Sequence, residues 1–205
     1  MAVRNKIACV ILAGGKGSRL DGAGKLNQKI GKYTMLDIVY KKIETQFDII
    51  AINVKSKNTF TSKIYQNITY DYFDEDIGPL AGIHSAMKFT NSKLGKNSLL
   101  ITVPVDTPFL PGDLYKKLML EYKKSKSQIV VAKSNGKRHP TIALWQSNLV
   151  NTLEKKISEN VRKIDHFSSY YSTTFVEWNN KEIDPFFNIN DYNDLKYAES
   201  MLKIK

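Results

Sequence analysis

Three glycines and three basic residues come together directly after a short apolar segment. Residues 7–12 are all apolar, and they lead into the string Ala13-Gly14-Gly15-Lys16-Gly17-Ser18-Arg19-Leu20. Glycine has no Cβ, so the backbone N–H groups of such a loop can turn toward one point and come close to a ligand. With Lys16, Arg19 and Lys25 placed around it, the loop favours an anion, and a polyphosphate is the natural occupant.

Glycine-rich turns also follow the first strand in proteins that bind no phosphate, so a plain structural turn stays open at this point. Two well-known phosphate loops are excluded. The sequence contains no Gly-x-x-x-x-Gly-Lys-Ser/Thr string, and Leu20 stands where a dinucleotide fingerprint has its third glycine. The loop therefore argues against a P-loop NTPase and against a standard dinucleotide-binding dehydrogenase.

An acid follows a second apolar segment in the middle of the chain. Residues 98–103 predict a buried central strand, and Asp106 comes just beyond it, between two prolines in Pro104-Val105-Asp106-Thr107-Pro108. An unpaired carboxylate is costly to desolvate, so this acid is poor packing material but a good ligand for a hard cation. Mg²⁺ commonly takes one or two carboxylates and fills its other positions with water and phosphate oxygens. We therefore predict that Asp106 is a metal ligand.

Two other positions offer contacts to a ligand. Asn53 lies near the end of the predicted strand 49–54. Its side chain either stabilises a turn there or hydrogen-bonds to a base or ribose. Pro79 in Gly78-Pro79-Leu80-Ala81-Gly82 predicts a helix start, whose free N–H groups offer a second place for close ligand approach. A capped helix without a ligand is the alternative there.

These residues need a scaffold, and strand and helix patterns alternate along the chain. Strands are predicted at residues 7–12, 49–54, 68–73, 98–103, 128–132, 139–145 and 169–178, with helices at 36–47, 61–66, 80–87, 111–122, 149–157 and 191–202. Asn135-Gly136 predicts a hairpin turn, and Asp191 predicts a helix cap. This alternation is typical of an α/β fold with a mostly parallel sheet.

Length and composition limit the number of domains and the class of protein. A chain of 205 residues with 42% hydrophobic content can bury one full core, so we expect a single domain, 1–205. The net charge of +11 attracts polyanions, but the lysine pairs fall on predicted exposed helix faces, and we expect no nucleic-acid partner.

No apolar run has the roughly 18 residues of a membrane span, and no signal peptide precedes the first strand. We expect a cytoplasmic protein in which Cys9, the only cysteine, is a buried packing residue.

The motifs together resemble one family. Residues 12–20 with Lys25 look like the signature of nucleotidyltransferases with the glycosyltransferase-A-like fold, a Rossmann-like three-layer α/β/α architecture. Adding residues 78–82, residues 104–108, His139-Pro140-Thr141 and Phe187-Asn188-Ile189-Asn190, the chain resembles the molybdenum cofactor guanylyltransferases of the MobA type. The five motifs keep their order from the first strand to the last helix.

The resemblance implies roles for particular residues. Lys25, Arg19 and Asp106 would be catalytic, and Asp106 would hold Mg²⁺. The GTP-binding set would be Leu12, Ala13, Gly14, Gly15, Gly17, Lys25, Asn53, Asp71, Gly78, Pro79, Leu80 and Asp106. Gly82, Asn188 and Asn190 would lie toward the molybdopterin. About residues 1–125 would form the nucleotide-binding half and about 126–205 the acceptor side.

The implied reaction is Mg-dependent transfer of GMP from GTP to the terminal phosphate of molybdopterin, which gives the guanine dinucleotide cofactor and pyrophosphate. Other proteins of molybdenum cofactor biosynthesis, or target enzymes, would be partners. Two alternatives stay open: a related cytidylyltransferase acting on molybdopterin or on a sugar or polyol phosphate, and a nucleotide-binding module without turnover. The chain departs from the family pattern at Gly24, where the family usually has an acid directly before the lysine.

Overall fold

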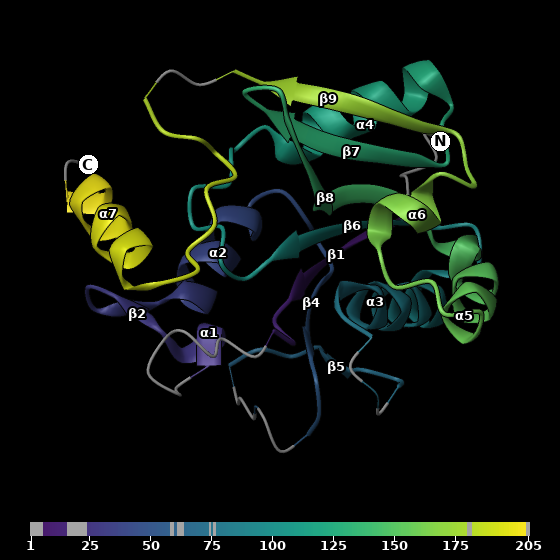
Figure 1. Ribbon diagram of the computed structural model, residues 1–205, viewed down its shortest axis with the longest axis horizontal. Helices are drawn as coiled ribbons and strands as arrows, with labels where there is room; N and C mark the ends of the chain where they lie inside the picture. The colour runs from purple at the N-terminus through teal and green to yellow at the C-terminus, as the bar shows by residue number, and fades with distance from the viewer. Residues whose placement is uncertain are drawn as a thin grey trace.

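The central sheet is mostly parallel. The computed structural model describes residues 6–15, 24–57, 60, 64–73, 75, 77–179 and 182–203. Within them, seven strands form one sheet in the order β5-β4-β1-β6-β8-β7-β9 (Figure 1). Their bounds are β1 Ile7–Leu12, β4 Ile50–Val54, β5 Ile68–Tyr70, β6 Leu99–Pro104, β7 Ile129–Ser134, β8 Lys137–Gln146 and β9 Thr173–Trp178. β8 runs antiparallel to β6 and β7, and the other pairs are parallel.

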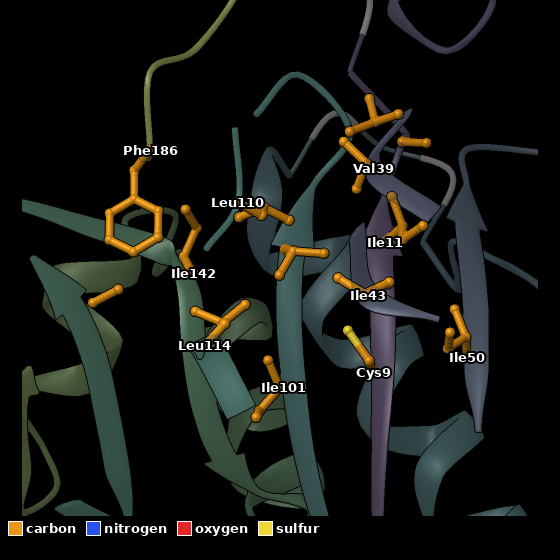
Figure 2. Packing of buried hydrophobic residues seen from close by; sticks show 14 of the residues in the cluster. Cys9, Ile11, Val39, Ile43, Ile50, Ile101, Leu110, Leu114, Ile142 and Phe186 are labelled. Carbon is orange, nitrogen blue, oxygen red and sulfur yellow. The ribbon is translucent and has the colours of Figure 1, made fainter. Parts of the chain in front are cut away.

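Helices cover both faces of this sheet. They are α1 Gly24–Asn27, α2 Met35–Ile43, α3 Pro79–Leu94, α4 Leu114–Ser125, α5 Val150–Ser158, α6 Ile164–Ser168 and α7 Tyr192–Lys203, with one 3₁₀ turn at Ser147–Leu149. Successive strand residues point to opposite faces. Cys9 and Ile11 of β1 therefore pack with α2 and α4 (Figure 2), whereas Val10 packs with α3, α5 and α6. The predicted three-layer α/β/α fold is confirmed.

Local sequence signals explain where several elements begin. Thr34 and Asp37 form a capping box at the start of α2, since the Thr34 hydroxyl accepts from the Asp37 N–H at 3.1 Å. Pro79 is the first residue of α3, as predicted, because its missing N–H costs nothing there. The Asp191 carboxylate caps α7 by accepting from the Asn193 and Asp194 N–H groups at 2.9 and 3.0 Å. Asn135 and Gly136 both have positive φ and join β7 to β8.

Some predicted elements are shorter or absent. β5 ends at Tyr70, because the Tyr72 N–H donates to Ser85 Oγ on α3 instead of to a strand. β9 starts at Thr173, since the residues before it make the turn after α6. The helix predicted at 61–66 was wrong over 64–66, where Ile64 and Gln66 are bends and Tyr65 has no regular structure, while 61–63 lie outside the described residues. The short hairpin of β2 (Lys29–Ile30) and β3 (Tyr33–Thr34), α1 and α6 were not predicted.

Two further observations concern the cysteine and the length of the helices. Cys9 is fully buried, and burial raises the pKa of its thiol well above the usual value, so it is a packing residue. No helix within the ranges given above is long and apolar enough to span a membrane.

Candidate functional site

A cavity of about 250 Å³ opens at the carboxyl ends of β1, β4 and β6, the usual place for a ligand in a parallel α/β sheet. Its lining comes from most of the regions that the sequence singled out: Leu12, Gly14, Gly15, Lys25, Asn53, Lys55, Asp71, Glu75, Ile77, Gly78, Pro79, Ala81, Gly82, Pro104, Val105, Asp106 and Thr141. The structure thus brings the glycine loop, the acid after β6 and the start of α3 to one place.

The described part of the glycine loop is fixed to the strands beside it. The Ala13 N–H donates to the Asn53 carbonyl oxygen at 2.8 Å, and the Leu12 carbonyl oxygen accepts from the Val105 N–H at 3.1 Å. Gly14 and Gly15 follow and line the cavity, whereas Ala13 is part of the core. Gly17 and Arg19, together with Lys16, lie outside the described residues, so the roles assigned to them remain predictions.

Asn53 and Asp71 form a linked pair at one end of the cavity. Asn53 Nδ2 donates to Asp71 Oδ1 at 3.0 Å, and the Asn53 side chain is 1% exposed. Burial raises the pKa of Asp71, while the Asn53 hydrogen bond and the Lys55 charge act in the opposite direction. Asn53 therefore orients Asp71 from inside the sheet. This role differs from the strand-end turn, which was one of the two alternatives that the sequence left open.

Gly82 packs tightly against this pair. A Cβ on Gly82 would lie 2.6 Å from Asn53 Oδ1 and 3.2 Å from Leu12 Cδ2, so only glycine fits without displacing a neighbour. This residue was predicted to lie with Asn188 and Asn190. Gly82 lies against Asn53 of β4 and Leu12 of β1, and its place on the molybdopterin side remains a prediction.

The start of α3 contributes backbone more than side chains. Gly78 has φ +71°, a value that favours glycine, and it lines the cavity with Pro79. The Leu80 side chain, predicted to bind GTP, is instead fully buried in the core beneath α3. Helical spacing turns Leu80 toward the sheet and leaves Ala81 and Gly82 on the cavity side.

Lys25 and Asp106 meet in the middle of the cavity. Lys25 Nζ donates to Asp106 Oδ2 at 2.5 Å and to Asn190 Oδ1 at 3.0 Å. The Asp106 carbonyl oxygen accepts from the Ile189 N–H at 2.9 Å, which ties the segment before α7 to the end of β6. Asn190 Nδ2 donates to the Asn188 carbonyl oxygen at 3.4 Å. The two asparagines thus reach the site through Asn190.

The Asp106 carboxylate has room for one more partner. Asp106 Oδ1 is buried and has no hydrogen-bond partner in the described chain. A buried oxygen of this kind is costly unless something binds it, and a carboxylate oxygen suits a hard cation. The described residues include no group of three or more His, Cys, Asp or Glu side chains that could hold a metal alone. The donor set fits Mg²⁺ that takes most of its oxygens from phosphate and water.

Seven lining residues were not predicted as site residues: Lys55, Glu75, Ile77, Ala81, Pro104, Val105 and Thr141. Lys55 directly follows β4, so its place after a parallel strand was a usable signal. Ala81 lay inside the motif already marked. Glu75 carried no such signal, because a single loop acid is common anywhere. Thr141 ended the motif His139-Pro140-Thr141, which carried part of the resemblance but was given no role.

The comparisons with known proteins agree with this site. A family model described as a MobA-like NTP transferase domain matches residues 9–171. The molybdenum cofactor guanylyltransferase of Rhodopseudomonas palustris (strain HaA2) is 32% identical over 193 residues, which cover 94% of this chain and 90% of that protein. The molybdenum cofactor guanylyltransferase of Rhizobium meliloti (strain 1021) is 36% identical over 199 residues and covers 94% and 90%.

A solved structure shows the same fold. The molybdopterin-guanine dinucleotide biosynthesis protein A of Archaeoglobus fulgidus matches with a TM-score of 0.80 at 22% identity, over 97% of this chain and 100% of that one. The family match and the full-length relatives carry the assignment beyond fold. The chain is a nucleotidyltransferase with a MobA-like NTP transferase domain, and it belongs to the family of the molybdenum cofactor guanylyltransferases.

Proposed function

We propose that this protein transfers GMP from GTP to the terminal phosphate of molybdopterin. The observation that carries the proposal is the Lys25–Asp106 contact of 2.5 Å, in a cavity that the glycine loop and the Asn53–Asp71 pair also line. A transferred phosphoryl group needs a cation and a cation ligand at the same point, and a simple nucleotide-binding module does not. The relatives that match over nearly the whole chain carry the corresponding name.

The reaction exchanges one phosphoanhydride bond for another. A terminal phosphate oxygen of molybdopterin attacks the α-phosphorus of GTP, a new P–O bond forms, and the bond to the β-phosphate breaks with release of pyrophosphate. Both reactants are anions, so the protein's task is to position them and to neutralise charge. No covalent enzyme intermediate is needed.

The roles follow the order of the residues along the cavity. The Gly14 and Gly15 backbone binds the polyphosphate, as do the predicted Gly17 and Arg19. Asp71, held by Asn53, binds the nucleoside. Lys25 stabilises the charge that develops at the α-phosphate.

Asp106 has two functions in this proposal. Its Oδ2 positions Lys25 at 2.5 Å, and its unpartnered Oδ1 is the protein ligand for Mg²⁺. When bound, Mg²⁺ supplies Lewis-acid neutralisation of the phosphate charge. Lys25 moves toward the substrate as GTP enters, because a phosphate competes with Asp106 for the ammonium group.

The direct test is to incubate the purified protein with molybdopterin, Mg²⁺ and each NTP in turn, and to measure pyrophosphate and the dinucleotide product. We expect product with GTP. Product with CTP alone would favour a molybdopterin cytidylyltransferase. Tight GTP binding without pyrophosphate, under conditions where a known guanylyltransferase is active, would contradict the proposal.

A further inference from the structure

The strand β8 carries an insertion where it passes the cavity. On the hairpin side, Ala132 of β7 pairs with His139, but the next β7 residue, Val131, pairs with Ala143. Residues 140–142 therefore have no counterpart on β7 and form a bulge. Pro140 explains its position, since proline has no N–H to donate to the ladder. Bulges commonly occur beside active sites, where they redirect a side chain.

Buried hydrogen bonds hold this bulge in place. Ser134 Oγ and His139 Nε2 are 2.7 Å apart at its base. At its centre, Thr102 Oγ1 donates to the Thr141 carbonyl oxygen at 2.9 Å. Trp145 Nε1 in turn donates to Thr102 Oγ1 at 2.9 Å, which leaves the Thr102 hydroxyl proton free for Thr141. The backbone of Thr141 is thus fixed, and its side chain is not needed for the anchor.

Thr141 lies at the wall of the cavity. Thr141 lines the cavity together with Pro104 and Asp106. Among the residues with described positions, none hydrogen-bonds to its hydroxyl, although the residue is only partly exposed. The hydrogen bond from Thr102 fixes the Thr141 backbone at the cavity wall, so the Thr141 hydroxyl is a donor available to a ligand.

The order of the strands indicates which substrate the Thr141 hydroxyl contacts. Across the sheet the strands run β4, β1, β6 and β8, and they bring Asn53, Gly14, Asp106 and Thr141 to the cavity in that order. In the proposed function, the nucleoside binds at Asn53 and the polyphosphate binds over the loop that contains Gly14. Thr141 is one strand beyond Asp106, on the side away from the nucleoside.

We propose that the Thr141 hydroxyl donates a hydrogen bond to the phosphate of the acceptor and is an acceptor-binding residue. This inference rests on the proposed function, because it needs a phosphorylated acceptor on the far side of Asp106 from GTP. The β8 bulge is then the device that aims the donor, and Thr102 is a positioning residue that acts through it.

The test compares Thr141→Val with Thr141→Ser. Valine keeps the branched shape and removes the hydroxyl, whereas serine keeps the hydroxyl. We expect Thr141→Val to raise the KM for molybdopterin about ten- to a hundredfold, the cost of one hydrogen bond to a charged group. Thr141→Ser should stay within about threefold of wild type. The Kd for GTP should not change in either variant.

Measurements on both substrates separate the possible outcomes. Direct titration with molybdopterin should show the same loss of affinity in Thr141→Val as the kinetics. Wild-type acceptor affinity and KM in Thr141→Val would overturn the role of Thr141 while leaving the proposed function standing. Equal losses in the valine and serine variants, or a loss confined to GTP, would also overturn it. No transfer of GMP by the wild-type protein would overturn both proposals.

Thr102→Val gives a second readout of the bulge. It removes the donor to the Thr141 carbonyl oxygen and leaves the Thr141 hydroxyl in place. We expect a rise in the acceptor KM smaller than that of Thr141→Val, and no further rise when the two substitutions are combined. Full additivity of the two effects would contradict a shared action through the bulge.

Discussion

The two ends of the cavity are built in different ways. At the nucleoside end, Asn53 lies within β4 and Asp71 directly follows β5, so both side chains come from adjacent parallel strands. At the other end, Thr141 lies on an antiparallel strand with a bulge, and Asn190 comes from the segment before α7. Lys25 and Asp106 lie between the two. The first end depends on the regular geometry of the sheet, and the second on contacts between residues far apart in the chain.

This difference separates what each end can tolerate. The nucleoside end is tightly packed, because a Cβ on Gly82 would lie 2.6 Å from Asn53 Oδ1. The acceptor end is held by individual hydrogen bonds, including the 3.0 Å contact between Lys25 and Asn190, which are 165 positions apart. Substitutions can therefore weaken the binding of one substrate without affecting the other, except at Lys25 and Asp106, which lie between the two ends.

The largest effect is expected at Asp106, which serves both ends. Asp106→Ala removes the proposed cation ligand and the partner of Lys25, and we expect transfer to fall by about 10³-fold or more, the equivalent of several kcal/mol. Pyrophosphate release measured over a range of Mg²⁺ concentrations checks this. Asp165→Ala is the matched control, because its carboxylate is 60% exposed and lies at a distant ion pair. Unchanged turnover at limiting Mg²⁺ would remove Asp106 from the reaction.

Lys25→Ala should have the next largest effect. A preorganised donor that acts mainly in the transition state typically contributes about 10²- to 10³-fold, so we expect kcat to fall more than the affinity for GTP. Steady-state kinetics combined with GTP titration separates the two quantities. Lys155→Ala, at a 75% exposed lysine, controls for the lost charge. A loss confined to GTP affinity would make Lys25 a binding residue only.

Asp71→Asn sharpens the comparison, because it should affect only the nucleoside end. We expect the Kd for GTP to rise about ten- to a hundredfold through loss of a charged acceptor, with the acceptor KM unchanged. Burial raises the pKa of Asp71, so its ionised form destabilises the folded state. The variant should therefore be more stable than wild type, with a difference that grows as pH rises above 3.8, the usual Asp value. GTP titration and thermal melts at several pH values check both effects, and lower stability at neutral pH would contradict the second.

The smallest effect is expected at His84, which lies behind the nucleoside end. Its ring is fully buried beside Tyr72 and Phe73, with Nε2 3.1 Å from the Glu154 carboxylate and Lys88 nearby. Burial lowers the pKa of His84 below its usual 6.5, although Glu154 opposes the shift. The unfolded chain therefore takes up a proton first, and stability falls as pH drops below 6.5. His84→Leu should flatten this decline in urea melts, and an unchanged slope would assign the decline to other groups.

The two ends also differ in how far the sequence predicted them. Local patterns singled out Asn53, near the end of one predicted strand, and Asp106, just beyond another. Parallel strands end at one edge of a sheet, so these patterns were enough to place both residues at the cavity. The role of Asp71 came from the resemblance. The resemblance supplied Asn190, but its contact with Lys25 depends on where the chain goes after β9. Thr141 belonged to a motif of the resemblance, but its place at the cavity was not predicted, because a register shift of β8 against β7 leaves no trace in hydrophobic alternation. Leu80 was misplaced because its helix turns it toward the core.

The hydrogen bond from Ile189 to Asp106 has a consequence for biosynthesis of the protein. The sheet strands β1, β4, β5 and β6 leave the ribosome long before this segment, and they and the residues that directly follow them carry Asn53, Gly14 and Asp71. The Lys25 contact to Asn190 has to wait for it. A nascent chain should therefore acquire a nucleotide pocket first and competence for transfer only near the end of translation.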